Sequence, residues 1–563
     1  MKAMTGGTTI QNALRLWLRY SNGDAFEEAT RHPAEAQERK LLEIVNRNKG
    51  TEYGRERDFA RVHSIKDFQN AVPRNTYESL SSSIHRMTRG ERNVLTADEP
   101  LMFATTSGTT GRAKYIPVTP SYLKEYSHGI NVHTHRVFAD YRDILGGKIL
   151  ASSSNDMEGR TEGNLPFGAI SGYMTRTQPE SIRSFFALPQ DVAMIKNIDQ
   201  KYYLTLRHAL AKDVRCLLTP NPSSLLLLAE KMNLYSQELI HDIRTGSVNP
   251  SFLPENPAPR LTAGLRADPR RADELAAIVG QTGALLPIEA WPNLRIICCW
   301  KGGTMPLYLR KLPEKFGDCP IRDVGYMASE GRGATPLVNS GAGGVLSITS
   351  HFFEFVPEDS HDDPDAEMLT SDQLESNREY YVFFTTSAGL YRYDINDVVR
   401  VVDFYRDTPV IEFVRKGQGI SSITGEKLTE SQVTAALIDT VERDSFDIQH
   451  FTACVEWGSP PRYAFYAEMG DSMTDDECRR FLIAMDRCLF EQNVEYEGKR
   501  ESQRLGFPVL KRVAPGGYQA LRQKRVAEGA PEAQVKIPQL STDMKFGEKL
   551  TVLDEIHAEG GTA

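Results

Sequence analysis

Residues 105–114, TTSGTTGRAK, combine five hydroxyl side chains, two glycines and Lys114. Glycines let backbone N–H groups turn inward toward an anion, hydroxyl groups add further donors, and a lysine supplies positive charge. This chemistry suits the triphosphate of a nucleotide. A surface turn can have the same composition, so the segment alone favours neither interpretation. The sequence has no glycine followed by Lys and then Ser or Thr, which disfavours a P-loop NTPase.

A second polar segment, DVGYMASEGRGATP, occupies residues 323–336. The ring of Tyr326 could stack on a base, and the carboxylate of Glu330 could hold a divalent cation that neutralises phosphate oxygens. A glutamate beside glycines is also common in solvated turns. By itself this segment is therefore weak evidence for a site.

A third segment, LYRYDINDVVRV, lies at residues 390–401 within a strand-like region. Strand alternation places Tyr391, Tyr393 and Ile395 on one face, and we expect Asp397 to open the following turn. A carboxylate at that point could accept hydrogen bonds from both ribose hydroxyls of a nucleotide. A simple turn aspartate between two strands is the alternative, and the segment alone favours it.

These segments need a scaffold, and the hydrophobic pattern predicts one. Residues 34–77 have helical spacing, and Ser64 three residues before Asp67 is typical of a helix cap. Between residues 101 and 311, short apolar runs alternate with longer helical stretches, which predicts α/β layering. The apolar runs are residues 148–151, 214–218 and 295–300.

After about residue 343 the chain becomes rich in strand-like runs, separated by Gly, Asp or Pro. This pattern predicts an antiparallel sheet or a small β-barrel. The runs are GGVLSITSHFFEFVP, REYYVFFTTSAGLYRYD, DVVRVVDFY and PVIEFVRK.

The end of the chain has a different pattern. RKGQGISSITG has little apolar periodicity and is typical of a linker or hinge. Beyond it, two amphipathic helical patterns flank two strand-like runs, which predicts a compact α+β domain. We therefore expect an N-terminal domain of residues 1–415, a hinge at 416–427 and a mobile C-terminal domain of residues 428–563.

Composition narrows the function classes. With 66 Lys and Arg against 75 Asp and Glu, the 563-residue chain has a net charge of −9 and no basic excess for nonspecific nucleic-acid binding. Arg15 and Arg19 interrupt the first apolar stretch, and no apolar run approaches the roughly 20 residues that span a bilayer. We expect a cytoplasmic protein without a nucleic-acid or membrane partner. The seven cysteines form no C-x-x-C pair, which argues against a zinc site or disulfide framework, so most should be buried thiols.

Together and in this order, the three segments resemble the acyl-acid amido synthetases, a plant auxin-responsive family also known in bacteria, which belongs to the adenylate-forming superfamily. TTSGTTGRAKYIPVT is similar to its phosphate-binding motif, YMASEG to its Tyr-x-x-x-Glu motif, and LYRYDINDVVRV to its Tyr-Arg…Asp motif. NRNKGTEYGRERDF, SIKDFQNAVPRNTYESL, ITGEKLTE and QVKIP also resemble family segments. The resemblance thus spans about residues 38–540, and it implies a large adenylate-forming domain followed by a smaller one.

The resemblance implies roles for matching residues at both ends of the site. Lys536 in QVKIP is similar to the late lysine that reaches into the site during adenylation, with a surface lysine before proline as the alternative. Lys114 would act with it as a catalytic lysine. The ATP phosphates would be bound by residues of the first motif, namely Thr106, Ser107, Gly108, Thr109, Thr110 and Lys114.

The other two motifs would complete the nucleotide site. By resemblance, Glu330 would help to coordinate Mg²⁺, and Tyr326 and Ser329 would line the nucleotide. Asp397 would bind the ribose, and Arg415 would lie near the ribose or a phosphate. The sequence departs from the family at residue 396, where asparagine replaces the usual glycine. This asparagine could tilt the turn that presents Asp397.

The resemblance implies a two-step ligase that uses ATP and Mg²⁺. A carboxylic acid would become an acyl-adenylate with release of pyrophosphate, and an amine, most simply an amino acid, would then take the acyl group. We expect the acyl pocket between residues 122 and 303. His128, His133 and His135 follow the first motif, but we expect scattered surface histidines there and assign no general base. An acid–thiol ligase that loads coenzyme A, and a nucleotide-binding protein without turnover, are the alternatives.

Overall fold

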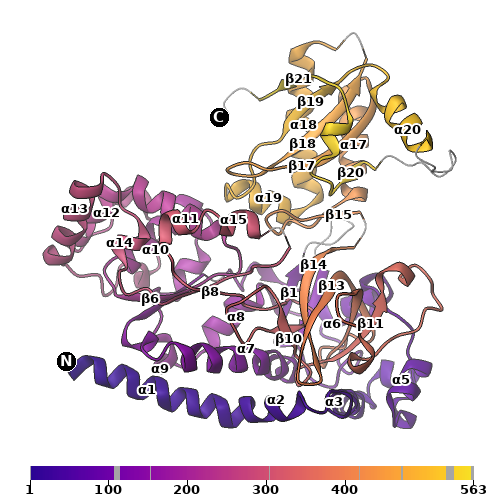
Figure 1. Cartoon of the computed structure of the whole chain (residues 1–563), viewed down its shortest axis with the longest axis horizontal. Helices are drawn as coiled ribbons and strands as arrows, with labels where there is room; N and C mark the ends of the chain where they lie inside the picture. Colours follow the sequence, from indigo (N-terminus) through magenta and orange to yellow (C-terminus); the bar gives the residue numbers. More distant parts are fainter. Residues whose placement is uncertain are drawn as a thin grey trace. The chain divides into compact units, whose positions relative to one another are not determined.

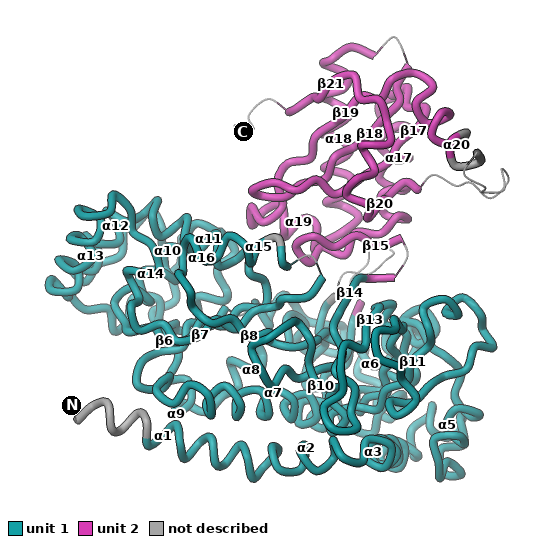
Figure 2. Tube along the Cα trace, viewed as in Figure 1, with its two compact units in different colours: residues 1–105, 115–415 teal, residues 106–114, 416–563 magenta. Residues whose placement is uncertain are grey.

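The computed structural model describes residues 2–106, 114–152, 154–303, 305–417, 419–470, 473–527 and 538–558. The chain divides into two compact units (Figure 2). The first contains residues 1–105 and 115–415, and the second contains residues 106–114 and 416–563. A large α/β unit and a smaller α+β unit confirm the predicted fold class. The exact hinge limits stay a prediction.

Helices dominate the start of the first unit, as predicted. Ser64 directly precedes helix α5 (Ile65–Ala71), and its hydroxyl accepts a hydrogen bond from the Asp67 backbone N–H at 3.1 Å. The predicted cap is therefore confirmed. The helices are α1 (Lys2–Leu18), α2 (Asp24–Ala29), α3 (Pro33–Asn48), α4 (Glu52–Glu56), α5 (Ile65–Ala71), α6 (Tyr77–Thr88) and α7 (Pro120–Asp140). Proline occupies the first turn of both α3 and α7, where its missing N–H costs no helical hydrogen bond.

A parallel sheet with the order β3-β6-β7-β8 forms the α/β part of the first unit. Its strands are β3 (Lys148–Ala151), β6 (Val214–Leu218), β7 (Ile296–Cys298) and β8 (Ile321–Arg322), so all three predicted apolar runs are strands. Helices fill the sequence between β3 and β8; residues of α10 to α14 and of α16 share a core with the sheet, and α10, α12 and α13 lie together (Figure 1). These helices are α8 (Ile170–Thr177), α9 (Glu180–Arg183), α10 (Ile198–Ala209), α11 (Ser223–Leu234), α12 (Ser236–Thr245), α13 (Pro269–Thr282), α14 (Pro287–Ala290), α15 (Pro306–Leu309) and α16 (Pro313–Phe316).

A second small sheet has the order β2-β1-β5-β4. It contains β1 (Met102–Thr106), β2 (Lys114–Val118), β4 (Gly159–Arg160) and β5 (Pro166–Gly168). The first polar segment therefore connects β1 to β2. Most of that segment, residues 107–113, lies outside the described residues.

The strand-rich region forms a six-stranded sheet with the order β11-β12-β13-β14-β10-β9. Its strands are β9 (Ala334–Thr335), β10 (Gly344–Leu346), β11 (Phe352–Pro357), β12 (Glu379–Thr385), β13 (Tyr393–Tyr405) and β14 (Thr408–Lys416). The pairs β11–β12, β12–β13, β10–β14 and β9–β10 are antiparallel, as predicted. One detail was wrong: Asp397 does not open a turn but lies inside the 13-residue strand β13.

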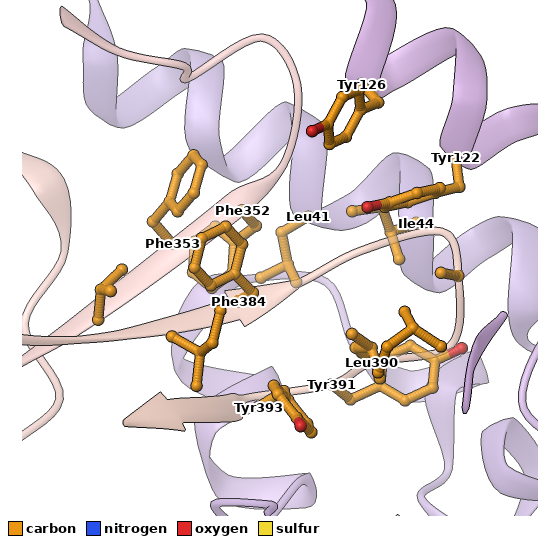
Figure 3. Packing of buried hydrophobic residues seen from close by; sticks show 14 of the residues in the cluster. Leu41, Ile44, Tyr122, Tyr126, Phe352, Phe353, Phe384, Leu390, Tyr391 and Tyr393 are labelled. Atoms are coloured by element: carbon orange, nitrogen blue, oxygen red, sulfur yellow. The ribbon is translucent and has the colours of Figure 1, made fainter. Parts of the chain in front are cut away.

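The main core of the first unit joins this sheet to the N-terminal helices. Leu41 and Ile44 of α3 pack with aromatic side chains of the sheet, among them Phe352 and Phe384, and all four are fully buried. Tyr122 and Tyr126 project into the same cluster from neighbouring turns of α7 (Figure 3). The polar motifs are thus built on a rigid, largely aromatic base.

The second unit packs helices on a five-stranded sheet with the order β20-β17-β18-β19-β21. The strands are β17 (Ile448–Glu456), β18 (Arg462–Met469), β19 (Val509–Val513), β20 (Leu540–Ser541) and β21 (Val552–Ile556), with a separate pair β15 (Ile420–Ser421) and β16 (Leu428–Thr429). The helices are α17 (Glu430–Asp444), α18 (Asp475–Gln492), α19 (Val494–Glu501) and α20 (Gly517–Ala527). Capping boxes begin α17 and α18, the two helices that were predicted from their amphipathic patterns.

Two expectations from composition can be compared with the described residues. All cysteines are free thiols and only Cys319 is not fully buried, as expected of packing residues. Within the described ranges, none of the helices combines the length and the apolar character needed to cross a bilayer.

Candidate active site

A buried hydrogen bond joins the second and third sequence motifs. The hydroxyl of Tyr326 donates to Oδ2 of Asp397 at 2.6 Å, across 71 residues of sequence. Burial and the charge of Asp397 raise the pKa of Tyr326 well above its ordinary value, so this hydroxyl remains a donor at neutral pH. The bond fixes one oxygen of the carboxylate that we expect to bind the ribose.

The ring of Tyr326 is itself held firmly. It stacks on Phe413 with centroids 6.0 Å apart and an interplanar angle of 19°, and Phe384 contacts its edge. A Cβ at Gly333 would lie only 2.2 Å from the Tyr326 ring, so only glycine allows the hairpin to close around it. Tyr326 is 9% exposed, and base stacking by its ring stays a prediction.

Glu330 is a buried carboxylate that lacks a partner among the described residues. It is 5% exposed, and its Oε2 has no hydrogen bond. Besides burial, which is the largest cause, its charge helps to raise the pKa of the surrounding tyrosine hydroxyls. These are Tyr122, Tyr126, Tyr326 and Tyr393. An unpaired buried charge is costly, so this position fits a residue whose partner is a ligand.

A chain of buried groups supports the loop that carries Glu330. The Tyr122 hydroxyl donates to the carbonyl oxygen of Ser329 at 2.7 Å, and the Tyr122 ring stacks on His351 at 5.6 Å. His351 Nδ1 lies 3.7 Å from Oε2 of Glu125, and the other oxygen of that carboxylate, Oε1, accepts a hydrogen bond from the Ser387 hydroxyl at 2.7 Å. Sequence reasoning missed Tyr122, Glu125 and His351, because nothing in their local sequence marks them as neighbours of Ser329.

The backbone next to Asp397 takes an unusual conformation. Asn396 has φ = 57°, in the left-handed region that glycine adopts freely and asparagine tolerates better than most residues. Its N–H donates to Oδ1 of Asp394 at 2.7 Å, and His361 Nε2 lies 2.7 Å from the other oxygen of the same carboxylate. The asparagine is therefore accommodated inside β13 by a specific side-chain contact.

The three histidines after the first motif are not surface groups, contrary to expectation. His133 is buried, and its Nε2 lies 3.0 Å from the carbonyl oxygen of Asp323. Burial, followed by the charge of Arg332, lowers the pKa of His133 to about 3, so it is neutral at physiological pH. His128 and His135 are half-buried and lie near backbone carbonyls.

The remaining predicted residues are only partly placed. Lys114 is half-buried at the start of β2, and Arg415, near the end of β14, pairs with Glu358 at 2.5 Å. The backbone of Thr106 ends β1. Ser107, Gly108, Thr109, Thr110 and Lys536 lie outside the described residues. The described part of the site thus brings together Tyr326, Ser329, Glu330 and Asp397.

Comparison with known proteins identifies the fold and the family of the chain. The chain is similar to a solved structure named GH3.15 acyl acid amido synthetase, with a TM-score of 0.63 and 24% identity. The similarity covers 95% of this chain and 97% of that chain. Its sequence matches the GH3 family N-terminal domain over residues 23–321, the central domain over 344–416 and the C-terminal domain over 431–545. The chain belongs to the GH3 family.

Two curated plant relatives illustrate the range of this similarity. The indole-3-acetic acid-amido synthetase GH3.4 of Arabidopsis thaliana is 26% identical over 552 residues, covering 91% of this chain and 90% of the relative. The jasmonoyl–L-amino acid synthetase JAR4 of Nicotiana attenuata is 24% identical, with 92% of each chain covered. The two relatives are named for different acids, so similarity alone does not select an acid for this chain.

Proposed function

We propose that this chain is an ATP-dependent acyl-acid amido synthetase. It adenylates a carboxylic acid to an acyl-AMP and then transfers the acyl group to an amine, most simply an amino acid. Family membership supports the reaction class. ATP and amino acids are abundant in the cytoplasm, which supports a cytoplasmic location.

The observation that carries this proposal is the buried contact between two motifs. Tyr326 and Asp397 share a 2.6 Å hydrogen bond, and the charges of both Asp397 and Glu330 act on the Tyr326 hydroxyl. A ribose-binding carboxylate and a metal-binding carboxylate must lie near each other around one nucleotide. The short connection through Tyr326 supports these two roles.

The donor set around Glu330 fits Mg²⁺. Mg²⁺ commonly uses one or two protein carboxylates, several waters and substrate phosphate oxygens. The described residues contain no group of three or more His, Cys, Asp or Glu that could enclose a metal, and Oε2 of Glu330 is buried without a partner. Glu330 would hold the ion against the phosphates, and the ion would neutralise their negative charge.

In the first step, a carboxylate oxygen attacks the α-phosphorus of ATP, and the bond to the pyrophosphate oxygen breaks. The chain mainly positions the reactants. Asp397 holds the ribose while Tyr326 fixes the orientation of Asp397. As pyrophosphate leaves, the negative charge of the phosphates is proposed to be stabilised by residues 106–110 of the first motif and by Lys114, Arg415 and Lys536.

In the second step, an uncharged amine attacks the acyl carbonyl, the bond to AMP breaks, and the amine proton is lost to solvent or base. The buried His133 cannot carry this proton at physiological pH, because its pKa of about 3 makes protonation unfavourable. None of the described residues is assigned as the base.

The decisive experiment is a hydroxylamine-trapping screen of carboxylic acids in which pyrophosphate release is measured. For each positive acid, mass spectrometry with a panel of amino acids and with coenzyme A identifies the product. We expect an amide, whereas a thioester would assign an acid–thiol ligase. Asp397→Ala should weaken ATP use strongly, and Lys536→Ala should suppress adenylation more than amide transfer. Near-normal pyrophosphate release by both variants would contradict the residue roles.

A further inference from the structure

Arg332 is a buried cation that has no counter-ion among the described residues. It is 1% exposed and follows Glu330 by two positions on the same hairpin. Its Nη2 donates to the carbonyl oxygen of Val324 at 2.8 Å, while its Nε has no hydrogen-bond partner among those residues. A guanidinium keeps its proton in proteins, so Arg332 is a buried cation.

None of the neighbouring groups in the described part of the chain forms an ion pair with Arg332, although the charge of Asp323 acts on it. Asp323 acts on it only from a distance, since its two oxygens accept the backbone N–H groups of Lys301 and Gly325, each at 2.6 Å. His133 is neutral because of its low pKa. Breaking or omitting the partner of a buried charge costs several kcal/mol, so a guanidinium in this state needs a ligand.

The surroundings of Arg332 connect it to the proposed acyl pocket. A Cβ at Gly129 of α7 would lie 2.6 Å from its Nε, so the absent side chain at Gly129 makes room for the guanidinium. Tyr126, one turn earlier on α7, is affected by the charges of both Arg332 and Glu330. Gly129 and Tyr126 both fall within the segment expected to form the acyl pocket.

We propose that Arg332 binds a second carboxylate of the acyl substrate, and hence that the acid is a dicarboxylic acid. This inference rests on the proposed function, because it assumes that an acid is adenylated beside Glu330. The reacting carboxylate loses its charge when acyl-AMP forms, so it would leave Arg332 unpaired after the first step. A remote carboxylate keeps its charge through both steps, and the fork of a guanidinium matches it with two parallel hydrogen bonds.

The first test uses straight-chain dicarboxylic acids, each compared with the monocarboxylic acid of the same length. Pyrophosphate release is measured for wild type and for Arg332→Met, which keeps an unbranched apolar stem and removes the guanidinium with its charge. Wild type should favour the dicarboxylic acid by at least about tenfold in kcat/KM, because charge-assisted hydrogen bonds are stronger than neutral ones. Arg332→Met should favour the monocarboxylic acid. An unchanged preference in this variant would overturn the inference.

Two further variants separate charge recognition from folding. Arg332→Lys keeps the charge without the fork, and it should retain part of the dicarboxylate preference. Arg322 is an equally buried arginine, 2% exposed, that already pairs with Asp140 at 2.5 Å. Arg322→Met should lower stability and leave the preference between the acids unchanged. A comparable change of preference in Arg322→Met would show a general packing effect and overturn the assignment.

A binding measurement distinguishes failure of this inference from failure of the proposed function. Without nucleotide, the best dicarboxylic acid should raise the Tm of wild type but not that of Arg332→Met. Equal shifts in both proteins would overturn the role of Arg332. A shift confined to wild type, with no pyrophosphate release from any acid, would support Arg332 and refute the synthetase activity.

Discussion

The substitution Glu330→Gln should reduce activity strongly without reducing the stability of the protein. The side chain is 5% exposed and Oε2 has no hydrogen-bond partner in the described part of the chain, so this carboxylate is buried there without a compensating contact. Glutamine has nearly the same shape and no charge. Replacing such charges by neutral groups is neutral or stabilising, so we expect the free energy of unfolding without metal to stay constant or to rise by about 1–3 kcal/mol.

A second buried carboxylate provides the matched control. Glu354 is 1% exposed, and its Oε2 accepts a hydrogen bond from Arg392 at 3.1 Å. Glu354→Gln leaves that guanidinium without its buried counter-ion, and breaking a buried pair of this kind costs about 3–5 kcal/mol. Equilibrium unfolding in urea, followed by tryptophan fluorescence, compares the two variants. The same substitution should thus have opposite effects at two equally buried sites.

The functional effect of Glu330→Gln should be large. Loss of one preorganised electrostatic contact to a reacting group commonly reduces kcat by about 10²–10³-fold, and we expect this loss in pyrophosphate release. The Mg²⁺ concentration for half-maximal rate should also rise. If Glu330→Gln is destabilised as strongly as Glu354→Gln, then Glu330 has a structural partner and the reasoning fails. An unchanged Mg²⁺ dependence would refute its metal role.

Three further substitutions probe the supports of the site. Asn396→Gly should retain stability and activity, whereas Asn396→Ala should lose about 1 kcal/mol of stability because φ is 57°; equal urea midpoints would contradict this. His361 has a raised pKa, chiefly from its hydrogen bond to Asp394. The stabilisation of the folded state by His361 is therefore complete below the pKa of about 6.5 in the unfolded chain, and it is lost as pH rises through the higher pKa in the folded state. The Tm of wild type should thus exceed that of His361→Gln by less as pH rises. Tyr122→Phe removes the donor to the Ser329 carbonyl, and it should raise the KM for Mg·ATP more than it lowers kcat; a change in kcat alone would argue against loop positioning.

The elements of the fold were largely predictable because each has a strong local signal. Ser64 caps α5 as predicted, and α17 and α18 were predicted from their amphipathic patterns. The prediction that Asp397 opens a turn was wrong, because a strand can continue through a single residue with left-handed backbone angles, here Asn396. Asp397 was expected to open a turn that Asn396 could tilt, yet Asp394 accepts the N–H of Asn396 and the strand goes on.

The candidate site was predictable only where a motif marked it. Tyr326, Glu330 and Asp397 were named from sequence, but the bond between Tyr326 and Asp397 depends on pairing that a single sequence does not contain. His133 was expected at the surface because its local sequence has no signal of burial, whereas tertiary packing of α7 buries it. Burial by distant segments has no local signal, so such residues require the structure.

Glu330 and Arg332 show why the unpaired groups are more informative than the paired ones. They are buried charges of opposite sign on one hairpin, and neither has an ion pair among the described residues. Pairing the two with each other would stabilise the unliganded protein, but the paired groups would then be unavailable to ligands. Keeping them apart lowers stability and preserves separate sites for a cation and an anion, a trade-off typical of functional sites. Each ligand should therefore stabilise the first unit by removing one uncompensated charge, and substrate binding should be coupled to folding through these two side chains.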